Sequence, residues 1–564
     1  MGIGGDSRPS PIPNSFSFLV VVVAVVLYLG PLFLDAPLTD PDEGLHAAIA
    51  QEMHERGDVV VPRFLGQAFL DKPILFFWTQ FASISAFGEN TAAARLPGML
   101  FALLGIATTG WLARVLFGGQ RAAGGGQQRT ADCRLPTAAW VAAACYATMV
   151  LPFLLAQAPV HDMALVPFTN LALAFLWRGR DPGSGIRDPI LAGVALGLSI
   201  LTKGLEGVAI VGVGYGLYLL LARAVTWRVV WQGMAVLALA VVIALPWYLA
   251  MDARQPGYLQ YYFIDRHLLG FATDTQRHGG QPWWFYVPLA VGGGLPWILY
   301  VNLAGGSRQA AGGSRRSAVG SRQSEMLLWT WLLGALTLLS LSGSKAVTYV
   351  LPAMPAIAIL AGRSWVAALS AETREGAGDP RRLLHAALFF VIAALTPWGG
   401  SRFANQPVTT VEAVAFAVLS AAWLWLMITL RRRSAAYAWP RLVVATGATY
   451  AAAFVLLGPP IAQAHSARDL AGYFKSPESL PGTIFIMDER VSFVYYLRPD
   501  VRHALRADRI RSVSVEELAS MKPFPRDAVV ALPADLVGRL SRVPQLANAS
   551  RRAAGRYVVV LPGD

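Results

Sequence analysis

Charged residues and cysteines are scarce in this sequence. Only 14% of its 564 residues are charged, whereas a soluble domain carries about 25%. This shortage argues against a large soluble enzyme for most of the chain. The two cysteines, Cys133 and Cys145, are too few for a disulfide framework or a cysteine-ligated metal cluster.

Long polar stretches are also rare, because uncharged runs of about 20 residues recur along the chain. These runs predict a mainly α-helical, polytopic membrane protein with about thirteen transmembrane helices. The expected spans are 16–34, 92–117, 136–156, 162–177, 188–202, 205–222, 229–250, 284–304, 326–342, 346–362, 384–399, 411–430 and 440–460. No small-residue cleavage site follows the first run, so we expect a retained helix and not a cleaved signal.

The formal net charge of +13 does not indicate a nucleic-acid partner. The basic residues are spread over short loops between apolar runs, and the positive-inside rule explains them if the N-terminus is cytoplasmic. Every inside loop then carries arginine: Arg121, Arg129 and Arg134; Arg178, Arg180 and Arg187; Arg223 and Arg228; Arg308, Arg315, Arg316 and Arg322; Arg363, Arg374, Arg381 and Arg382; Arg431, Arg432 and Arg433. An odd number of spans places the C-terminus outside.

One further apolar run, 74–88, competes with this topology. If it crossed the membrane, the basic loop 118–135 would face outside and all later loops would invert. The run is short and contains several polar residues, so we expect an amphipathic helix that lies in the membrane interface. Residues 35–91 then form one long external loop.

The apolar runs stop after residue 461. Residues 465–564 alternate strand-like runs with helical stretches, which predicts a small external α/β domain following a membrane domain of residues 1–464. The expected strands are 483–487, 492–497, 528–532 and 557–561, and the expected helices are near 467–475 and 514–521.

Three acids stand where the first span reaches the outside. Asp40 can cap a helix, Pro41 suits its first position, and Glu43 can close a capping box. The box does not need Asp42. We therefore expect Asp42 to be functional, whereas Asp40 and Glu43 are equally compatible with a structural role.

Further polar residues fall on the same side of the membrane in this topology. They are Asp71 and Lys72, His161 and Asp162, Lys203, His278, and the segment Ser342–Lys345 with Tyr349. Each of these residues alone can be explained without a function, for example as a lysine that snorkels to the membrane surface or a histidine packed in the core. Together they place acids, lysines and histidines on one side of one membrane, as an anionic lipid-linked substrate requires.

The first external loop resembles that of bacterial aminoarabinose-transferase-like glycosyltransferases, relatives of the protein O-mannosyltransferases in the GT-C superfamily. The sequence that carries the resemblance is DEGLHAAIAQEMHERGDVVVPRFLGQAFLDKPILFFW, followed by AARLPG. Shorter matches continue with LTKG at 201–204, HGGQPWWFYVPL at 278–289, GLPW at 294–297 and SGSKAVTYVLPAMP at 342–355. The resemblance covers most of the membrane part.

The resemblance implies a GT-C fold in the bacterial inner membrane. It also implies transfer of a sugar, with inversion, from a polyprenyl-phosphate donor to an envelope lipid, glycan or protein on the outer face. Asp42, Lys72 and Asp162 then match catalytic positions, with Lys72 facing the donor phosphate. Substrate-binding candidates are Glu43, His46, Arg63, Phe69, Lys203, Lys345 and Tyr349. Asp71 and His278 match a pair that can share a divalent metal.

The chain departs from the family pattern at several of these positions. Leu45-His46 replaces an Arg-Tyr pair, Asp71 replaces Glu, and Phe69 replaces Tyr. Aminoarabinose and lipid A are therefore not carried over. A transporter of lipid-linked sugars and a binding protein that has lost activity stay open as alternatives. We expect removal of residues 465–564 to affect stability or acceptor choice more than donor cleavage.

Overall fold

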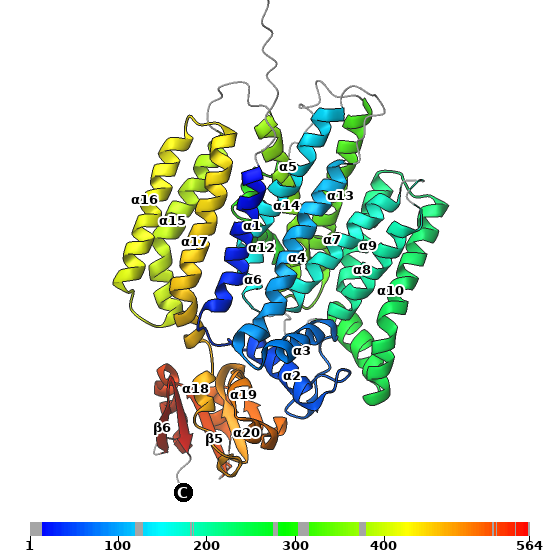
Figure 1. Ribbon diagram of the computed structural model, residues 1–564. Coiled ribbons are helices and arrows are strands. Elements are labelled where there is room, and N and C mark those ends of the chain that lie inside the picture. Colours follow the sequence, from blue (N-terminus) through cyan, green and yellow to red (C-terminus); the bar gives the residue numbers. More distant parts are fainter. Residues whose placement is uncertain are drawn as a thin grey trace, which may run out of the picture.

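The protein is described by a computed structural model. It covers residues 14–118, 128–158, 160–180, 183, 185–273, 280–302, 315–370, 379–521, 524–525, 527–546 and 549–561. A bundle of long helices makes up most of the molecule, and a small sheet domain lies beyond one of its ends (Figure 1). The mainly α-helical membrane architecture predicted from the apolar runs is confirmed.

Helices occupy all thirteen of the predicted runs. The bundle is made of α1 (Asn14–Leu29), η1 (Gly30–Phe33), α4 (Thr91–Gly118), α5 (Gln128–Ala147), α6 (Val150–Ala156), α7 (His161–Gly179), α8 (Arg187–Lys203), α9 (Glu206–Leu221), α10 (Trp227–Arg254), α12 (Tyr286–Gly293), η4 (Trp297–Tyr300), α13 (Arg315–Leu341), η5 (Val347–Ala353), α14 (Met354–Ser370), α15 (Pro380–Ala404), α16 (Thr410–Leu430) and α17 (Ala435–Ala464).

Not every one of these helices is long enough to cross a bilayer by itself. Within the described ranges, eight helices are long and apolar enough, and the pair α5–α6, bent by 65°, brings the number to nine. Helices α7 and α8 carry buried polar side chains among their apolar ones, including Asn170 and Ser199. The chain is a multi-pass membrane protein, and the count of thirteen spans stays a prediction.

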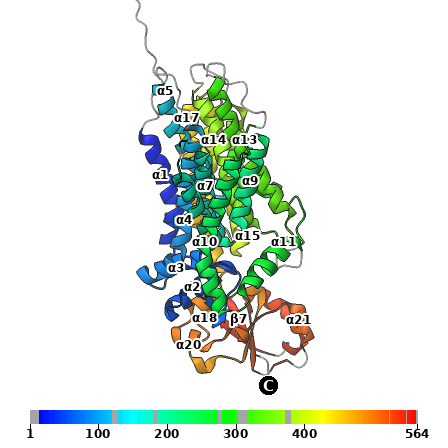
Figure 2. The same ribbon diagram turned by 90° about the vertical axis from the view of Figure 1, so that its right-hand side faces the viewer.

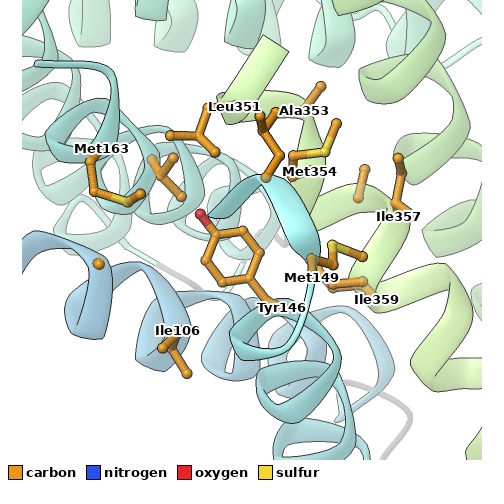
Figure 3. Close-up of a cluster of buried hydrophobic side chains, with 14 of the residues drawn as sticks. Ile106, Tyr146, Met149, Met163, Leu351, Ala353, Met354, Ile357 and Ile359 are labelled. Atoms are coloured by element: carbon orange, nitrogen blue, oxygen red, sulfur yellow. The ribbon is translucent and has the colours of Figure 1, made fainter. Parts of the chain in front are cut away.

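The bundle has a continuous apolar core. Helix α7 packs against α4 and α8, α8 against α10, and α15 against α16 and α17. Figure 3 shows part of the core, where Tyr146, Met149, Met163 and Leu351 come together with Met354 and its neighbours from α14. Close packing of this kind holds the ends of the helices in fixed positions relative to one another.

The loop between α1 and α4 lies at the end of the bundle that faces the sheet domain (Figures 1 and 2). It contains α2 (Asp42–Arg56), a hairpin of β1 (Arg63–Phe64) and β2 (Gln67–Ala68), and α3 (Leu75–Phe87). Helix α3 coincides with the predicted interfacial run and packs on α2 and α4. With 13 residues it is shorter than the roughly 20 needed to cross a bilayer.

The predicted capping box is wrong in its details. Helix α2 begins at Asp42, and no side chain caps it from Pro41. Glu43 instead accepts hydrogen bonds from the backbone N–H and the hydroxyl of Thr39, at 2.7 and 2.8 Å. Asp40 does not cap the helix because its carboxylate is bonded to the C-terminal domain.

The C-terminal domain contains a five-stranded sheet in the order β4-β3-β5-β7-β6. Strands β3 and β4 and strands β3 and β5 pair in parallel, and β7 is antiparallel to both β5 and β6. The elements are α18 (Arg468–Ala471), η6 (Pro477–Ser479), β3 (Thr483–Ile486), η7 (Met487–Glu489), α19 (Phe493–Tyr496), α20 (Pro499–Ala504), η8 (Ala507–Arg509), β4 (Ile510–Ser512), α21 (Val515–Ser520), β5 (Ala528–Pro533), η9 (Ala534–Arg542), η10 (Pro544–Leu546), β6 (Ser550–Ala554) and β7 (Tyr557–Leu561).

One predicted strand is a helix. Residues 492–497 were expected to be extended, but Phe493–Tyr496 form the single turn α19. The three consecutive residues Phe493, Val494 and Tyr495 are all buried, which a strand with one solvent face does not provide. This turn packs on α2.

Candidate active site

A buried lysine forms the first part of the site. Lys203, the last residue of α8, pairs with Asp162 at the start of α7 and with Glu206 at the start of α9, the latter at 2.8 Å. Its ammonium also lies 3.7 Å from the centre of the Tyr349 ring. The Lys203 ammonium therefore forms ion pairs with two carboxylates at once.

The local sequence explains this arrangement. Gly204, with φ +68°, ends α8 and lets the chain turn straight into α9, so that Lys203 and Glu206 lie side by side. A Cβ at position 204 would overlap the ring of His267 and the hydroxyl of Tyr262. The motif LTKG is thus a tight turn that only glycine fits, pressed against the segment that follows α10.

That segment is the π-helical turn η3 (Gln260–Leu269), and it forms the second part of the site. Tyr261 donates a hydrogen bond of 2.7 Å to Asp71, and Arg266 pairs with the other oxygen of Asp71 at 3.1 Å. Burial, together with the bond to Asp71, raises the pKa of Tyr261 to about 12, so the phenol keeps its proton. Burial lowers the pKa of His267, and its neutral ring accepts from the N–H of Leu205 at 3.4 Å.

Lys72 lies between these two parts. Its ammonium interacts electrostatically with Lys203, Asp162, Arg266 and Asp71. Burial, followed by repulsion from Lys203, lowers the pKa of Lys72. Among the described residues, however, it forms no hydrogen bond and no ion pair. A partly buried cation without a partner is suited to an anion from outside the protein.

An aromatic wall connects this cluster to α2. The rings of His46 and His161 are 4.8 Å apart, and Phe69 and Phe77 contact His46 edge-on. His161 is 1% exposed, and neither of its ring nitrogens has a hydrogen-bond partner within the described part of the chain.

Asp42 lies one helical turn before His46, so both side chains are on the same face of α2. The carboxylate of Asp42 is exposed and forms no hydrogen bond or ion pair with the described residues. Asp42 is therefore on the same side of α2 as His46 of the aromatic wall, and no hydrogen bond or ion pair within the described residues ties its carboxylate to the loop.

Most of the predicted site residues lie in or beside one cluster. Lys72, Asp71, Asp162, Lys203 and Tyr349 converge, and His46 and Phe69 form the wall beside them. Lys345 is buried before η5, where its ammonium donates to the carbonyl of Ser342.

Two other candidates have contacts elsewhere, and one is not described. Glu43 is buried and pairs with Arg95 at 2.5 Å. Arg95 also donates to the carbonyls of Ala36 and Pro37, so this pair holds the first loop against α4. Arg63 lies in the β1–β2 hairpin and donates to the carbonyl of Gly66. His278 lies outside the described residues.

Sequence analysis missed Glu206, Tyr261, Arg266 and His267. Glu206 was detectable, since it stands three residues after Lys203 at a helix boundary. Arg266 and Tyr261 gave no signal, because their partner Asp71 is about 190 residues away in sequence.

The described residues give no support to the metal predicted at Asp71. Both oxygens of Asp71 already have partners, and in the described ranges no three His, Cys, Asp or Glu side chains are grouped as metal ligands. The distance between Asp71 and His278 stays untested.

Comparisons with known proteins agree with the resemblance found in the first loop. Residues 133–262 match the family described as dolichyl-phosphate-mannose-protein mannosyltransferase. The chain is 32% identical over 353 residues to the undecaprenyl phosphate-alpha-4-amino-4-deoxy-L-arabinose arabinosyl transferase of Pseudomonas aeruginosa, covering 62% of this chain and 59% of that protein. The enzyme of the same name from Edwardsiella ictaluri is 29% identical over 346 residues, covering 61% and 58%. The match thus spans less than two thirds of these relatives.

The fold matches over nearly the whole chain. The crystal structure of ArnT from Cupriavidus metallidurans bound to undecaprenyl phosphate superposes with a TM-score of 0.69. The superposition covers 97% of this chain and 98% of that one, at 22% sequence identity. The apo structure gives a TM-score of 0.67. The chain therefore has the ArnT fold, and its resemblance to the aminoarabinose-transferase-like glycosyltransferases of the GT-C superfamily is confirmed in sequence and in fold.

Proposed function

We propose that the protein is an integral membrane glycosyltransferase. It moves a sugar from a polyprenyl-phosphate donor to a cell-envelope lipid, glycan or protein on the outer face of the bacterial inner membrane. The observation that carries the proposal is Lys72, a cation that forms no hydrogen bond or ion pair with any described residue, at the end of the bundle where a lipid phosphate would emerge.

The donor phosphate binds at Lys72, whose charge is not neutralised by an ion pair with any described residue, unlike the charges of Lys203 and Arg266. Lysine suits this role, since a compact ammonium can follow the negative charge that grows as the glycosidic bond breaks. The comparisons support undecaprenyl phosphate as the lipid carrier. The two related transferases are named for it, and the ArnT crystal structure was determined with it bound.

Asp42 acts as the general base. It takes the proton of the acceptor hydroxyl while the acceptor oxygen forms a bond to the anomeric carbon of the sugar. The bond from that carbon to the phosphate oxygen breaks, and its electron pair stays on the phosphate beside Lys72. Attack on the face opposite the phosphate inverts the anomeric configuration. Asp162 holds Lys203 in place, and His46, Phe69 and Tyr349 line the space for the sugar.

The sugar and the acceptor are not taken over from the relatives. Leu45-His46 and Asp71 replace residues of the family pattern next to this space, so aminoarabinose and lipid A are tests and not part of the proposal. No step is assigned to a metal, since Asp71 is paired with Arg266 and Tyr261. The transporter alternative gains no support, because the relatives are named as transferases.

The proposed orientation puts the N-terminus in the cytoplasm and the first loop with residues 465–564 outside. Charge supports it: Arg431, Arg432 and Arg433 follow α16 at the end of the bundle away from the sheet domain (Figure 1). Arginines of this kind are typical of the cytoplasmic side.

The test uses purified protein in lipid nanodiscs and a panel of undecaprenyl-phosphate sugars, with release of undecaprenyl phosphate as the readout. Asp42→Asn is expected to lower turnover by roughly 100-fold or more, with undecaprenyl phosphate still bound. Asp35→Asn is the matched control, because Asp35 is an acid of the same loop whose side chain is 90% exposed. Wild-type protein that neither binds undecaprenyl phosphate nor releases it from any donor refutes the proposal.

A further inference from the structure

Helix α2, which carries Asp42, packs on α3 on one side and on α19 of the C-terminal domain on another. The closest approach is at Gly44, two residues after Asp42. A Cβ on Gly44 would overlap both the Cβ and the Cα of Ser492. The backbone of α2 therefore lies directly against the start of α19.

Asp40 strengthens the contact from the other side of Asp42. Its carboxylate accepts hydrogen bonds from the backbone N–H and the hydroxyl of Ser492, both at 2.6 Å, and from the N–H of Ala467 at 3.1 Å. Its own N–H donates to the carbonyl of His465 at 2.9 Å. Asp42 is thus flanked by two residues, Asp40 and Gly44, that are both held on Ser492.

The far end of α2 is held as well. Glu55 pairs with the buried guanidinium of Arg502 and lies 3.1 Å from His503. Gln51 donates to the carbonyl of Tyr495 at 3.3 Å. Contacts to the C-terminal domain therefore run along the whole helix, and we refer to those of Asp40, Gly44, Gln51 and Glu55 as the clamp.

We propose that the C-terminal domain positions the catalytic base, because the clamp fixes α2 and with it Asp42. Asp40 and Ser492 are positioning residues in this view and do not touch the substrate. The inference rests on the proposed function. It also differs from the expectation that removing residues 465–564 would affect stability or acceptor choice more than donor cleavage.

The physical argument is that the backbone of α2, which the clamp holds against the C-terminal domain and the Glu43–Arg95 pair holds against α4, is the only support of Asp42 among the described residues. Its carboxylate has no partner among the described residues, so the backbone of α2 alone decides where it lies. A general base must reach its proton within hydrogen-bond distance, and a shift of about 1 Å can cost on the order of 100-fold in rate. Substitutions that remove contacts of the clamp should therefore slow the chemical step without weakening donor binding at Lys72.

The experiment uses the full-length protein in nanodiscs and measures kcat for undecaprenyl-phosphate release, the Kd of undecaprenyl phosphate, and amide hydrogen exchange. Asp40→Ala removes all three hydrogen bonds, and Ser492→Ala removes one. Gly44→Ala keeps the bonding groups but pushes α2 away. Asp35→Ala is the matched control, because Asp35 pairs with Arg468 of the same domain only at the exposed surface, at 3.3 Å.

We expect kcat to fall by about 10- to 100-fold in Asp40→Ala and Gly44→Ala, less in Ser492→Ala, and not in Asp35→Ala. The Kd should stay at the wild-type value. Exchange should become faster in Asp42–Arg56 but not in Leu75–Phe87. Wild-type kcat in both Asp40→Ala and Gly44→Ala overturns the inference. A parallel loss of kcat and affinity also overturns it, since it indicates general unfolding.

Hydrogen exchange separates this inference from the proposed function. Unchanged exchange in α2 of Asp40→Ala and Gly44→Ala overturns the clamp whatever the activity is. If the wild type releases no undecaprenyl phosphate from any donor while exchange responds as expected, the clamp exists, and it is the proposed function that fails along with the positioning role.

Discussion

Lys72 and Lys203 are neighbours in the same cluster, yet replacing them should change stability in opposite directions. Lys203 forms ion pairs with the buried Asp162 and the partly buried Glu206. Lys72 has no hydrogen bond or ion pair in the described part of the chain, and burial lowers its pKa. Methionine fills a volume close to that of lysine without charge, so Lys203→Met and Lys72→Met form a matched pair.

The magnitudes follow from what each substitution leaves behind. Lys203→Met leaves these two carboxylates without their cation, and breaking a buried pair in this way costs about 3–5 kcal/mol. Lys72→Met removes a desolvated charge whose attraction to Asp162 and Asp71 only partly offsets its burial. We expect the variant to be as stable as the wild type or more stable, by up to about 1 kcal/mol.

The same substitution should weaken ligand binding. A hydrogen bond between ammonium and phosphate contributes about 1.5–3 kcal/mol. Losing it should raise the Kd of undecaprenyl phosphate by roughly 10- to 150-fold. Undecaprenyl phosphate should therefore raise the melting temperature of the wild type, and it should do so far less in Lys72→Met.

The assay is thermal unfolding of the purified proteins in nanodiscs, with and without undecaprenyl phosphate, combined with direct measurement of its Kd. Two results would refute the reasoning. One is a Lys72→Met protein that is destabilised as much as Lys203→Met, which would make Lys72 a structural charge. The other is wild-type affinity for undecaprenyl phosphate in Lys72→Met, which would place the phosphate elsewhere.

Three further predictions concern the first loop and the topology. Glu43→Gln leaves Arg95 buried without its carboxylate, so unfolding should become easier by about 3 kcal/mol or more, and any loss of activity should parallel a loss of folded protein; an inactive but fully stable variant would contradict this. Burial raises the pKa of Asp40 from 3.8 to about 6, against hydrogen bonds from Ser492 and Ala467 that lower it. Because the pKa of Asp40 is higher in the folded protein, protonation of Asp40 stabilises the fold fully below about pH 4. This contribution to the free energy of unfolding, about 3 kcal/mol, is lost as the pH rises to about 6. Chemical unfolding across this range should show the decrease in the wild type and not in Asp40→Ala. Reporter fusions after 433 should be cytoplasmic and those after 464 external, and an external signal at 433 would invert the proposed orientation.

Much of the membrane part could be predicted from the sequence because the bilayer imposes strong rules on composition. Runs of apolar residues located the helices, and the mixed run 74–88 forms the short helix α3. Lys72, Asp162 and Lys203 could be grouped because the predicted topology places all three on the outer side of the membrane. None of this needed knowledge of tertiary contacts.

What failed depended on partners far away in the sequence. Asp40 looked like a helix cap, since its local pattern fits one, but Ser492 lies more than 450 residues later and takes its carboxylate. Arg266 and Tyr261 sit in a loop whose sequence gave no reason to place them beside Asp71. Residues 492–497 are rich in the aromatic and branched residues typical of strands, yet Phe493–Tyr496 form a helical turn that packs on α2.

The charges of the cluster show how the proposed reaction gains from this arrangement. Lys203 and Arg266 are neutralised by Asp162, Glu206 and Asp71, whereas Lys72 has no ion pair within the described residues. A donor phosphodiester carries a single negative charge, and the phosphate released at neutral pH carries about −1.5 to −2. The extra charge develops only as the sugar leaves. A cation already neutralised by the protein would respond weakly to that change, but Lys72 is free to do so, and an interaction that strengthens between ground state and transition state is the kind that accelerates a reaction.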